Sequence, residues 1–431
     1  MTKIEWTEQT WNPIVGCTIV SPGCTNCYAM RMAARIEAMD EAAYRKQVEQ
    51  AVEVAVDRDH EERIRADMNN GRVPTHYAGT TKSSKAGAVW TGKVALAPEH
   101  ILTEPLRRRK PTMYFVNSMS DLFHEDVPDW WIYLALAAMA LTYDASEYNE
   151  NRVVIERRPR HVYQVLTKRS ARMKAFMTAL HAASDYKANA EWLQHHFSEA
   201  ARRMSQAAGH PYWMNAPLVA WQWVTAGCPG LWLGVSAERQ QEADARIPDL
   251  LATPAAVRFV SAEPLLGPVD FTHIDVPSYG NLNALDDGYF VDGRPPRRRL
   301  DWIIVGGESG PGARPMHPDW ARNIRDQCTA AGVPFFFKQW GQWLVGERPQ
   351  GDSIAQRVFQ DGDDFMVVSD GHDIALGAAE DEKNGPRRIW SKYGGWQGNL
   401  VKYVREKSAC RLLDGREWNE MPGTQADEVA A

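Results

Sequence analysis

Few cysteines, no long apolar run and no strong excess of one charge characterise this sequence. Six cysteines in 431 residues are too few for the disulfide framework of a small secreted domain. Every apolar run is shorter than the roughly 20 residues that span a bilayer, and the first ten residues lack the basic-then-apolar layout of a secretory signal. We therefore expect a globular, cytoplasmic protein without a membrane partner. The net charge of -6 does not by itself demand a nucleic acid.

Short apolar runs that lead into helical patterns recur along the chain. Seven strands are expected, at Trp11–Cys17, Met113–Val116, His161–Leu166, Leu231–Val235, Val257–Val260, Leu300–Val305 and Val333–Phe337. Helices are expected at Tyr28–Met39, Asp129–Tyr143, Ala171–Ala183 and Pro318–Ala331, with a short one ending near Leu251. Continuous apolar runs are typical of parallel strands buried on both faces. The pattern predicts an α/β fold, a parallel β/α barrel of partial or full TIM type with helical and loop insertions.

Long segments interrupt these units. We expect a barrel over residues 1–344, insertions at about 40–112, 184–230 and 270–299, and a C-terminal extension over 345–431. The first insertion contains a charged helical stretch, Glu41–Met68, and a Gly/Ser/Lys-rich loop, Gly79–Lys85. The third reads as an irregular loop. The extension predicts short strands at Arg357–Phe359 and Phe365–Val368 and a disordered end at 423–431.

Polar or ionisable residues stand where the expected strands end. In β/α barrels the carboxyl ends of the strands carry the chemistry, so these side chains are expected to line a pocket. They include Asn117, Lys168, Glu238, Glu263, Glu308 and Lys338. Each can also be an ordinary polar residue that ends a strand. Another reading is a barrel hydrolase that uses Glu238 and Glu263 as paired carboxylates.

Three of the six cysteines lie in one short loop. Cys17, Cys24 and Cys27 form a C-x6-C-x2-C pattern between an expected strand and an expected helix. Three thiolates are one ligand short of a closed tetrahedral site and of a fully protein-ligated cubane, so one metal position stays open. In a reducing compartment such clustering predicts a metal centre, and we expect a [4Fe-4S] cluster. Gly16 and Gly23 permit the tight turns that fold a loop around it.

Two other readings of this loop stay open. One is a zinc site completed by a distant residue such as a histidine, in a protein that binds a nucleic acid or a partner without catalysis. The available histidines are His124, His161, His195, His196 and His317. The other reading is that the thiols are unrelated or form a regulatory disulfide.

The segments around the cysteines match the pattern of a known family. Trp11–Cys17 reads WNPIVGC, and Ser21–Ala29 reads SPGCTNCYA. Further matching stretches are Asn117–Phe123, Leu166–Arg169, Gly234–Glu238, Ser261–Gly267, Gly306–Gly310, Phe337–Gly341 and Leu413–Pro422. On these motifs the chain resembles the phage-associated three-cysteine-motif family, which is similar to radical S-adenosylmethionine (SAM) enzymes such as spore photoproduct lyase. The usual radical SAM spacing, C-x3-C-x2-C, is three residues shorter before the second cysteine.

The resemblance implies an enzyme with SAM as its second cofactor. In such enzymes the open iron binds SAM, and an electron from an external donor cleaves it to a 5′-deoxyadenosyl radical. Cofactor contacts are expected of Tyr28, Ser261, Glu263, Gly306, Gly307 and Glu308, and either Glu238 or Glu263 can take the role of Glu308. Catalytic or substrate-contacting roles are expected of Asn117, Asp121, Lys168, Glu238 and Lys338.

Three basic clusters give an indication of the kind of substrate. They are Arg107–Lys110, Arg157–Arg160 and Arg297–Arg299. They predict contact with a phosphate backbone, with scattered solvated charge as the alternative. The family's phage setting implies a modified base of DNA, or a nucleotide, as substrate in the host cytoplasm. We expect isomerisation or another modification at an unactivated carbon, and a base in duplex DNA would first have to be flipped out.

Overall fold

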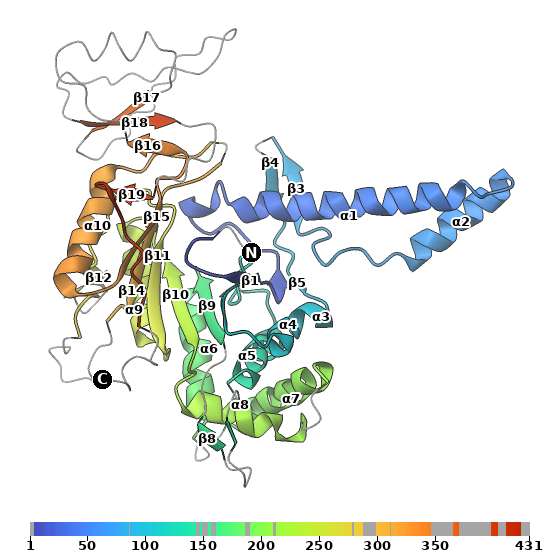
Figure 1. Cartoon of the computed structure of the whole chain (residues 1–431), viewed down its shortest axis with the longest axis horizontal. Helices are drawn as coiled ribbons and strands as arrows, with labels where there is room; N and C mark the ends of the chain where they lie inside the picture. Colours follow the sequence, from blue (N-terminus) through green and yellow to red (C-terminus); the bar gives the residue numbers. More distant parts are fainter. Residues whose placement is uncertain are drawn as a thin grey trace. The chain divides into compact units, whose positions relative to one another are not determined.

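Seven parallel strands form one sheet whose order follows the chain (Figure 1). The computed structural model describes residues 4–143 (without 86), 147–148, 154–156, 161–185, 190–209, 213–277, 280–287, 299–345 (without 311), 365–369, 398–403 and 411–423. The sheet strands are, in spatial order, β1 (Gln9–Trp11), β6 (Thr112–Val116), β9 (His161–Thr167), β10 (Leu231–Ser236), β11 (Val257–Ala262), β14 (Trp302–Gly306) and β15 (Phe335–Gln339). Adding strands in one direction is the winding of a β/α barrel, not of a doubly wound sheet. The predicted α/β barrel-type fold is confirmed in its partial form.

Two compact units divide within β10. Unit 1 comprises residues 1–233 with 253–256, and unit 2 comprises residues 234–252 with 257–431. The main helices of unit 1 are α1 (Tyr28–Val52), α2 (Arg58–Gly71), α5 (Asp129–Leu141), α6 (Ser170–Ala183), α7 (Glu191–Ala207) and α8 (Ala216–Thr225), with the short α3 (Glu99–Leu102) and α4 (Glu104–Arg107) before β6.

The helix α5 is apolar around its whole circumference. Its residues Ile132–Ala140 form an unbroken buried run, and α7 and α8 pack against it. Phe197 of α7, for example, lies 6.3 Å from Tyr133 between ring centroids. A helix of this kind must be covered on all sides, which explains why the described parts of the segment 184–230 are largely helical. Among the described residues, no helix is both long and apolar enough to cross a membrane.

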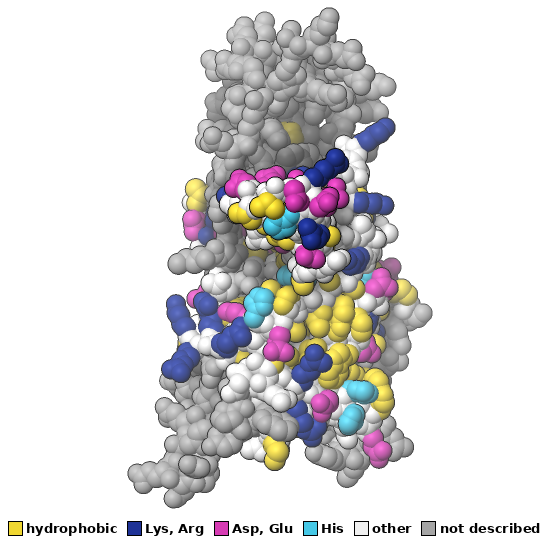
Figure 2. Space-filling view, turned by 90° about the vertical axis from the view of Figure 1, so that its right-hand side faces the viewer, with side chains coloured by type: hydrophobic (Ala, Val, Ile, Leu, Met, Phe, Trp, Pro, Cys, Tyr) yellow, Lys and Arg dark blue, Asp and Glu magenta, His cyan; other side chains and the backbone are white. Residues whose placement is uncertain are grey.

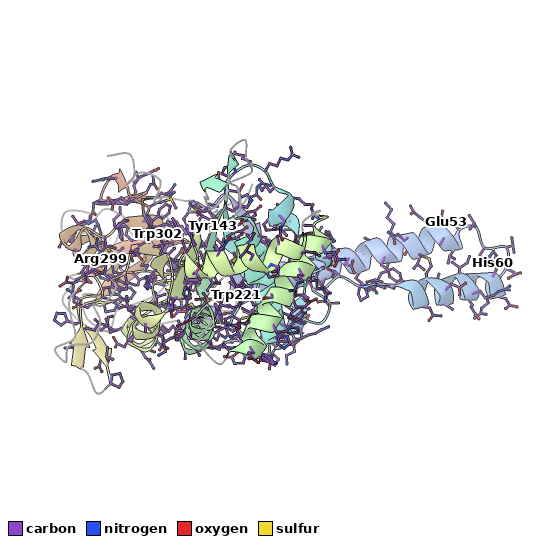
Figure 3. The ribbon with its side chains drawn as sticks, turned by 90° about the horizontal axis from the view of Figure 1, so that it is seen from below. Glu53, His60, Tyr143, Trp221, Arg299 and Trp302 are labelled. Carbon is purple, nitrogen blue, oxygen red and sulfur yellow. The ribbon has the colours of Figure 1, made fainter. Side chains whose placement is uncertain are left out.

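The charged stretch Glu41–Met68, predicted to be helical, is divided between two helices. The helix α1 continues from Tyr28 to Val52, and α2 begins after Asp57, whose carboxylate accepts a hydrogen bond from the His60 amide at 2.7 Å. The resulting hairpin, the arm, extends away from the rest of unit 1 (Figure 1). Figure 3 marks its free end with Glu53 and His60. Acidic, basic and hydrophobic side chains intermix over that end in Figure 2.

The Gly/Ser/Lys-rich segment, predicted as a loop, is a two-stranded ribbon. The strands β3 (Thr81–Ser84) and β4 (Gly87–Trp90) pair antiparallel. The ribbon is anchored through Trp90, which joins Ala29, Met30 and Ala33 of α1 in one buried apolar cluster. This anchoring is tertiary, so a composition rich in Gly, Ser and Lys does not reveal it.

In its described residues, unit 2 has α9 (Gln240–Ala252) and α10 (Pro318–Ala331) with three small antiparallel sheets. The hairpin of β12 (Ile274–Val276) and β13 (Gly280–Leu282) lies where an irregular loop was predicted. A second sheet has the order β16 (Trp343–Val345), β18 (Gly398–Tyr403), β17 (Phe365–Ser369), and β17 confirms the predicted strand at Phe365–Val368. The predicted strand Arg357–Phe359 and residues 424–431 lie outside the described residues.

The C-terminal segment covers one edge of β15. After the hairpin of β19 (Leu412–Leu413) and β20 (Arg416–Glu417), the carbonyl oxygen of Trp418 accepts a hydrogen bond from the Phe337 amide at 2.9 Å. The Trp302 indole donates to the carbonyl oxygen of Glu420 at 2.8 Å. The motif stretch Leu413–Pro422 therefore has a structural role, because it pairs with an edge that would otherwise be open.

Candidate functional site

The cysteine loop leaves β2 (Ile14–Val15) at Gly16 and enters α1 at Cys27. Gly16 has a φ of 88°, and a Cβ there would lie 2.0 Å from the carbonyl oxygen of Lys93, so the position demands glycine. A short 3-10 turn, Pro22–Cys24, reverses the chain. These local features explain how the loop turns tightly between a strand and a helix.

The three thiols lie in a largely apolar setting. Cys24 is buried, and the half-buried Cys17 and Cys27 pack against the apolar cluster that contains Val15 and Met30. Burial raises the pKa of the Cys17 thiol to about 12. It also raises the pKa of Cys27, although amide donors at the start of α1 oppose this rise. The rise at Cys17 persists although Arg169 lies nearby and opposes it, so this thiol stays protonated until a metal binds.

The guanidinium of Arg169 ties this loop to two strand ends. It donates to Cys17 Sγ at 3.5 Å and to Thr18 Oγ1 at 2.6 Å. It also pairs with Asp121 at 3.1 Å and with Glu125 at 3.3 Å. Burial lowers the pKa of Arg169, but the charge of Asp121 and its neighbours raises it above its ordinary value. The side chain is thus a fixed cation in contact with a loop thiol.

Asp121 fixes the position of that cation. Its carboxylate accepts hydrogen bonds from Thr167 Oγ1 at 2.6 Å, from the Lys168 amide at 2.9 Å and from the Phe123 amide at 3.0 Å. A buried carboxylate with this many donors is held in one orientation. The predicted site residues Asp121 and Lys168 are therefore brought together beside Cys17, and we call Cys17, Thr18, Cys24, Cys27, Asp121 and Arg169 the cysteine-loop site.

Asn117 adds a strained, buried amide at the end of β6. Its φ is 57°, in the left-handed region, and its side chain is 3% exposed. Its Oδ1 accepts from the Ile14 amide at 3.4 Å, whereas its Nδ2 has no hydrogen-bond acceptor within the described part of the chain. Nearby, the Tyr28 hydroxyl donates to the carbonyl oxygen of Ser118 at 3.0 Å. A buried donor without an acceptor suggests a position for a ligand.

The loop supplies the three thiols that a three-thiolate centre needs, but their positions do not yet match those of ligands of one metal centre. All three sulfurs come from one loop, and Cys24 is close enough to Cys27 to raise its pKa. Among the residues the structure describes, however, no three His, Cys, Asp or Glu side chains converge as the ligands of one metal ion. Binding of a cluster would therefore require the thiols to draw together.

Of the five histidines considered for zinc, His124 contacts the cysteine loop. Its Nε2 lies 3.0 Å from Thr18 Oγ1, and burial lowers the pKa of its imidazole. The others lie elsewhere: His161 at the amino end of β9, His195 and His196 in α7, and His317 at the N-terminus of α10 in unit 2.

Unit 2 brings three of its predicted residues together. Glu263 accepts a hydrogen bond from Ser261 Oγ at 3.2 Å and pairs with Lys338 Nζ at 2.9 Å. It lies over Gly306, where a Cβ would come within 2.5 Å of its Oε1. At Gly307 a Cβ would lie 2.0 Å from the carbonyl oxygen of Trp340. Local packing thus accounts for both glycines of the Gly-Gly-Glu motif.

The other two carboxylates of unit 2 are held by arginines of the same unit. Glu238 is 0% exposed and pairs with Arg246 at 2.9 Å. Glu308 accepts from the Arg314 amide at 2.8 Å and from its guanidinium at 2.9 Å. Both carboxylates therefore already have a cationic partner within the chain.

The three basic clusters do not share one role. Arg109 and Lys110 are exposed, but they precede β6 and so lie at the amino end of that strand, away from Asp121. Arg299 is engaged within unit 2, where it donates to the carbonyl oxygen of Ala331 at 3.1 Å. Arg157–Arg160 and Arg297–Arg298 lie outside the described residues.

Sequence reasoning missed several residues of this region. Arg169, Thr18 and Asn12 were not among the predicted site residues, although Asn12 accepts hydrogen bonds from Ser118 Oγ and the Met119 amide. The available signal was position: Arg169 directly follows Lys168, and Thr18 directly follows Cys17.

A family model described as "Protein of unknown function (DUF5131)" matches residues 1–422. Neither the curated proteins nor the solved structures contain a match.

Proposed function

The chain belongs to the DUF5131 family, and we propose that it is an iron–sulfur enzyme of radical SAM type. The observation that carries this proposal is a loop of three thiols, Cys17, Cys24 and Cys27, with the buried cation Arg169 in contact with the first of them. A cation suits a centre made of thiolates and sulfides, whose net charge is negative.

A [4Fe-4S] cluster on three thiolates would supply an open iron for SAM and the electron that cleaves it to methionine and a 5′-deoxyadenosyl radical. The chain's own residues bind and screen. Arg169 donates to Cys17, the first amides of α1 donate toward Cys27, and the apolar cluster keeps water from the sulfurs. Asn117 offers its free Nδ2 to an acceptor atom of a ligand.

The proposed reaction is an isomerisation or another modification at an unactivated carbon of a DNA base or nucleotide, with the electron coming from an external donor. The support is the match of this chain to the three-cysteine motifs quoted above. The proposed location is the cytoplasm of a host cell. The hydrolase alternative is disfavoured because Glu238 is fully buried and paired with Arg246, so it has no access to water as a base.

The test is anaerobic reconstitution of the full chain with iron and sulfide, followed by dithionite and SAM. We expect bound iron and sulfide, and formation of 5′-deoxyadenosine. Cys17→Ala, Cys24→Ala and Cys27→Ala should each abolish that product. Cys328→Ala is the matched control, because Cys328 is buried in α10 of unit 2 and should leave iron content unchanged.

Two results would refute the proposal. One is iron binding that survives loss of all three loop cysteines. The other is a colourless protein that binds zinc at the loop and does not bind SAM, which would favour a metal-bearing binding protein without catalysis.

A further inference from the structure

Two segments around the cysteine loop contain no acidic residue. Residues 9–36 and residues 72–98 lack aspartate and glutamate, although these make up 55 of the 431 residues. At that frequency, about one residue in eight, roughly seven acids would be expected in the two segments together. The charged residues that they do contain are Arg31, Arg35, Arg72, Lys82, Lys85 and Lys93.

The fold places these two segments side by side. The strand β2 pairs antiparallel with β5 (Ala95–Leu96), so that Val15 lies opposite Ala95. The backbone of Gly16 lies against the Lys93 carbonyl, and β3 and β4 both contact α1. The acid-free segments therefore form one continuous region around the cysteine loop.

This region presents cations and apolar groups to solvent. Lys82 and Lys85 are exposed on the β3–β4 ribbon, and neither forms an ion pair within the described part of the chain. Ile19 and Val20 are exposed in the loop, and Tyr28 is 49% exposed at the start of α1. We call these five residues the ribbon face.

Cations elsewhere in unit 1 lie in a different setting. On the arm, Arg65 pairs with Glu61 and Arg45 pairs with Glu41, so that surface is close to balanced. The two acids next to the cysteine loop, Asp121 and Glu125, are both paired with Arg169. Of the cations in the acid-free segments, Arg72 pairs with Asp40 and Glu41 of α1, whereas Lys82 and Lys85 have no acidic partner in the described part of the chain.

We propose that the ribbon face docks a nucleic-acid strand. Lys82 and Lys85 contact phosphates, and Tyr28 stacks on an unpaired base that is presented to the cysteine loop. A two-stranded ribbon also has the width that the major groove of a duplex admits. The exposed cations lie on two elements, since Arg35 of α1 is also exposed, so they suit a run of phosphates better than a single one. The inference rests on the proposed function in one respect, because it takes the bound strand as the substrate of the proposed enzyme.

The test is fluorescence anisotropy with a labelled single-stranded and a duplex oligonucleotide, over a series of salt concentrations. Lys82→Ala/Lys85→Ala should bind about tenfold more weakly, and the slope of log affinity against log salt should fall by about 2. Lys82→Arg/Lys85→Arg should bind as the parent chain does. The matched control is Arg109→Ala/Lys110→Ala, with the same loss of charge at the amino end of β6, and it should leave affinity unchanged.

Three outcomes would overturn the inference. They are unchanged binding in Lys82→Ala/Lys85→Ala, a larger loss in Arg109→Ala/Lys110→Ala, and competition by a mononucleotide as effective as by the unlabelled oligonucleotide. The same titration with Cys17→Ala/Cys24→Ala/Cys27→Ala, which lacks all three thiols, shows whether strand binding depends on the cluster. The parent chain shows whether the two proposals fail together or separately. If the strand binds but no cluster forms in the parent chain, the enzyme assignment fails and the docking surface stands. If a cluster forms but no strand binds, the reverse holds.

Discussion

The polar residues at the strand ends of unit 1 and of unit 2 differ in what they contact. In unit 1, Asp121 after β6 and Arg169 after β9 pair with each other, and the arginine reaches on to a loop thiol. In unit 2, Glu238 is buried and forms an ion pair with Arg246, and Glu308 forms an ion pair with Arg314. The polar residues of unit 1 thus converge on the cysteine loop. Those of unit 2 each form a separate ion pair with a neighbouring arginine.

This difference shows that position at a strand end does not identify a functional group. A carboxylate that ends a strand looks the same in the sequence of either unit. The role of the carboxylate depends on its partner. The partner can be a counterion that contacts nothing else of functional interest, or a residue that also contacts reactive groups. Substitutions at residues of both units test this distinction.

Loss of the cation beside Glu238 should cost the most stability. In Arg246→Met the fully buried carboxylate loses its ion pair and the side-chain cover over it. We expect the free energy of unfolding to fall by about 3–5 kcal/mol in a urea titration. The double variant Arg246→Met/Glu238→Gln should recover much of this loss, because no charge is then left buried. If the single variant is as stable as the parent, the pair is not structural.

The two glycines of the Gly-Gly-Glu motif should respond differently to alanine. At Gly307 the new methyl group meets the backbone of Trp340, which cannot move away, so we expect a loss of about 2–3 kcal/mol. At Gly306 it meets the end of the Glu263 side chain, which can shift, so the loss should be about 1 kcal/mol. Thermal unfolding of both variants gives the ranking. Equal losses would mean that the Glu263–Lys338 pair is as rigid as the backbone.

Arg169→Gln should combine a moderate loss of stability with a loss of iron. The glutamine leaves Asp121 with neutral donors only, and we expect about 2 kcal/mol in the free energy of unfolding. After anaerobic reconstitution, iron per chain should also fall, with Arg169→Lys intermediate. The control is Arg172→Gln, which breaks contacts to the Val127 carbonyl and Asp129 but touches no cysteine. Equal iron in both variants would make Arg169 merely structural.

Much of the fold could be predicted because its signals are local. The helix α10 spans Pro318–Ala331 as predicted, since a proline opens it and Gly332, with φ at 62°, ends it. The last strand was less accurate. It was predicted at Val333–Phe337 and lies at Phe335–Gln339, beside the distant Trp418 segment with which it pairs. The ribbon at Thr81–Trp90 was missed because α1 stabilises it.

The candidate site could be predicted only in part, for a similar reason. Spacing predicted the cysteines, position at a strand end predicted Lys168 and the family resemblance predicted Asp121, and the structure places the Asp121 carboxylate against the Lys168 amide and Arg169. Arg169 was missed, because its role appears only when β6, β9 and the cysteine loop come together. Likewise, the spacing of Glu238 and Arg246 gives no sign that they form a buried pair.

The exposed carboxylate of Asp414 in unit 2, which pairs with Arg322 and Arg325, should contribute least to the free energy of unfolding. It should do so only above acidic pH. Burial raises the pKa of Asp414, but hydrogen bonds from Arg325 and Arg322 outweigh this and lower it below its ordinary value. A carboxyl group with a lowered pKa adds stability above its unfolded pKa, about 3.9, and that stability is lost as pH falls through the folded value.

Asp414→Asn should therefore reduce the free energy of unfolding by about 0.5 kcal/mol at neutral pH, since the side chain is 39% exposed and solvent screens the pair. The measurement is urea unfolding of parent and variant from pH 6 to pH 3. The gap between them should close as the pH falls, because a protonated aspartate and an asparagine are both neutral. A gap that stays constant over this range would show that the contribution of Asp414 to stability does not depend on its charge.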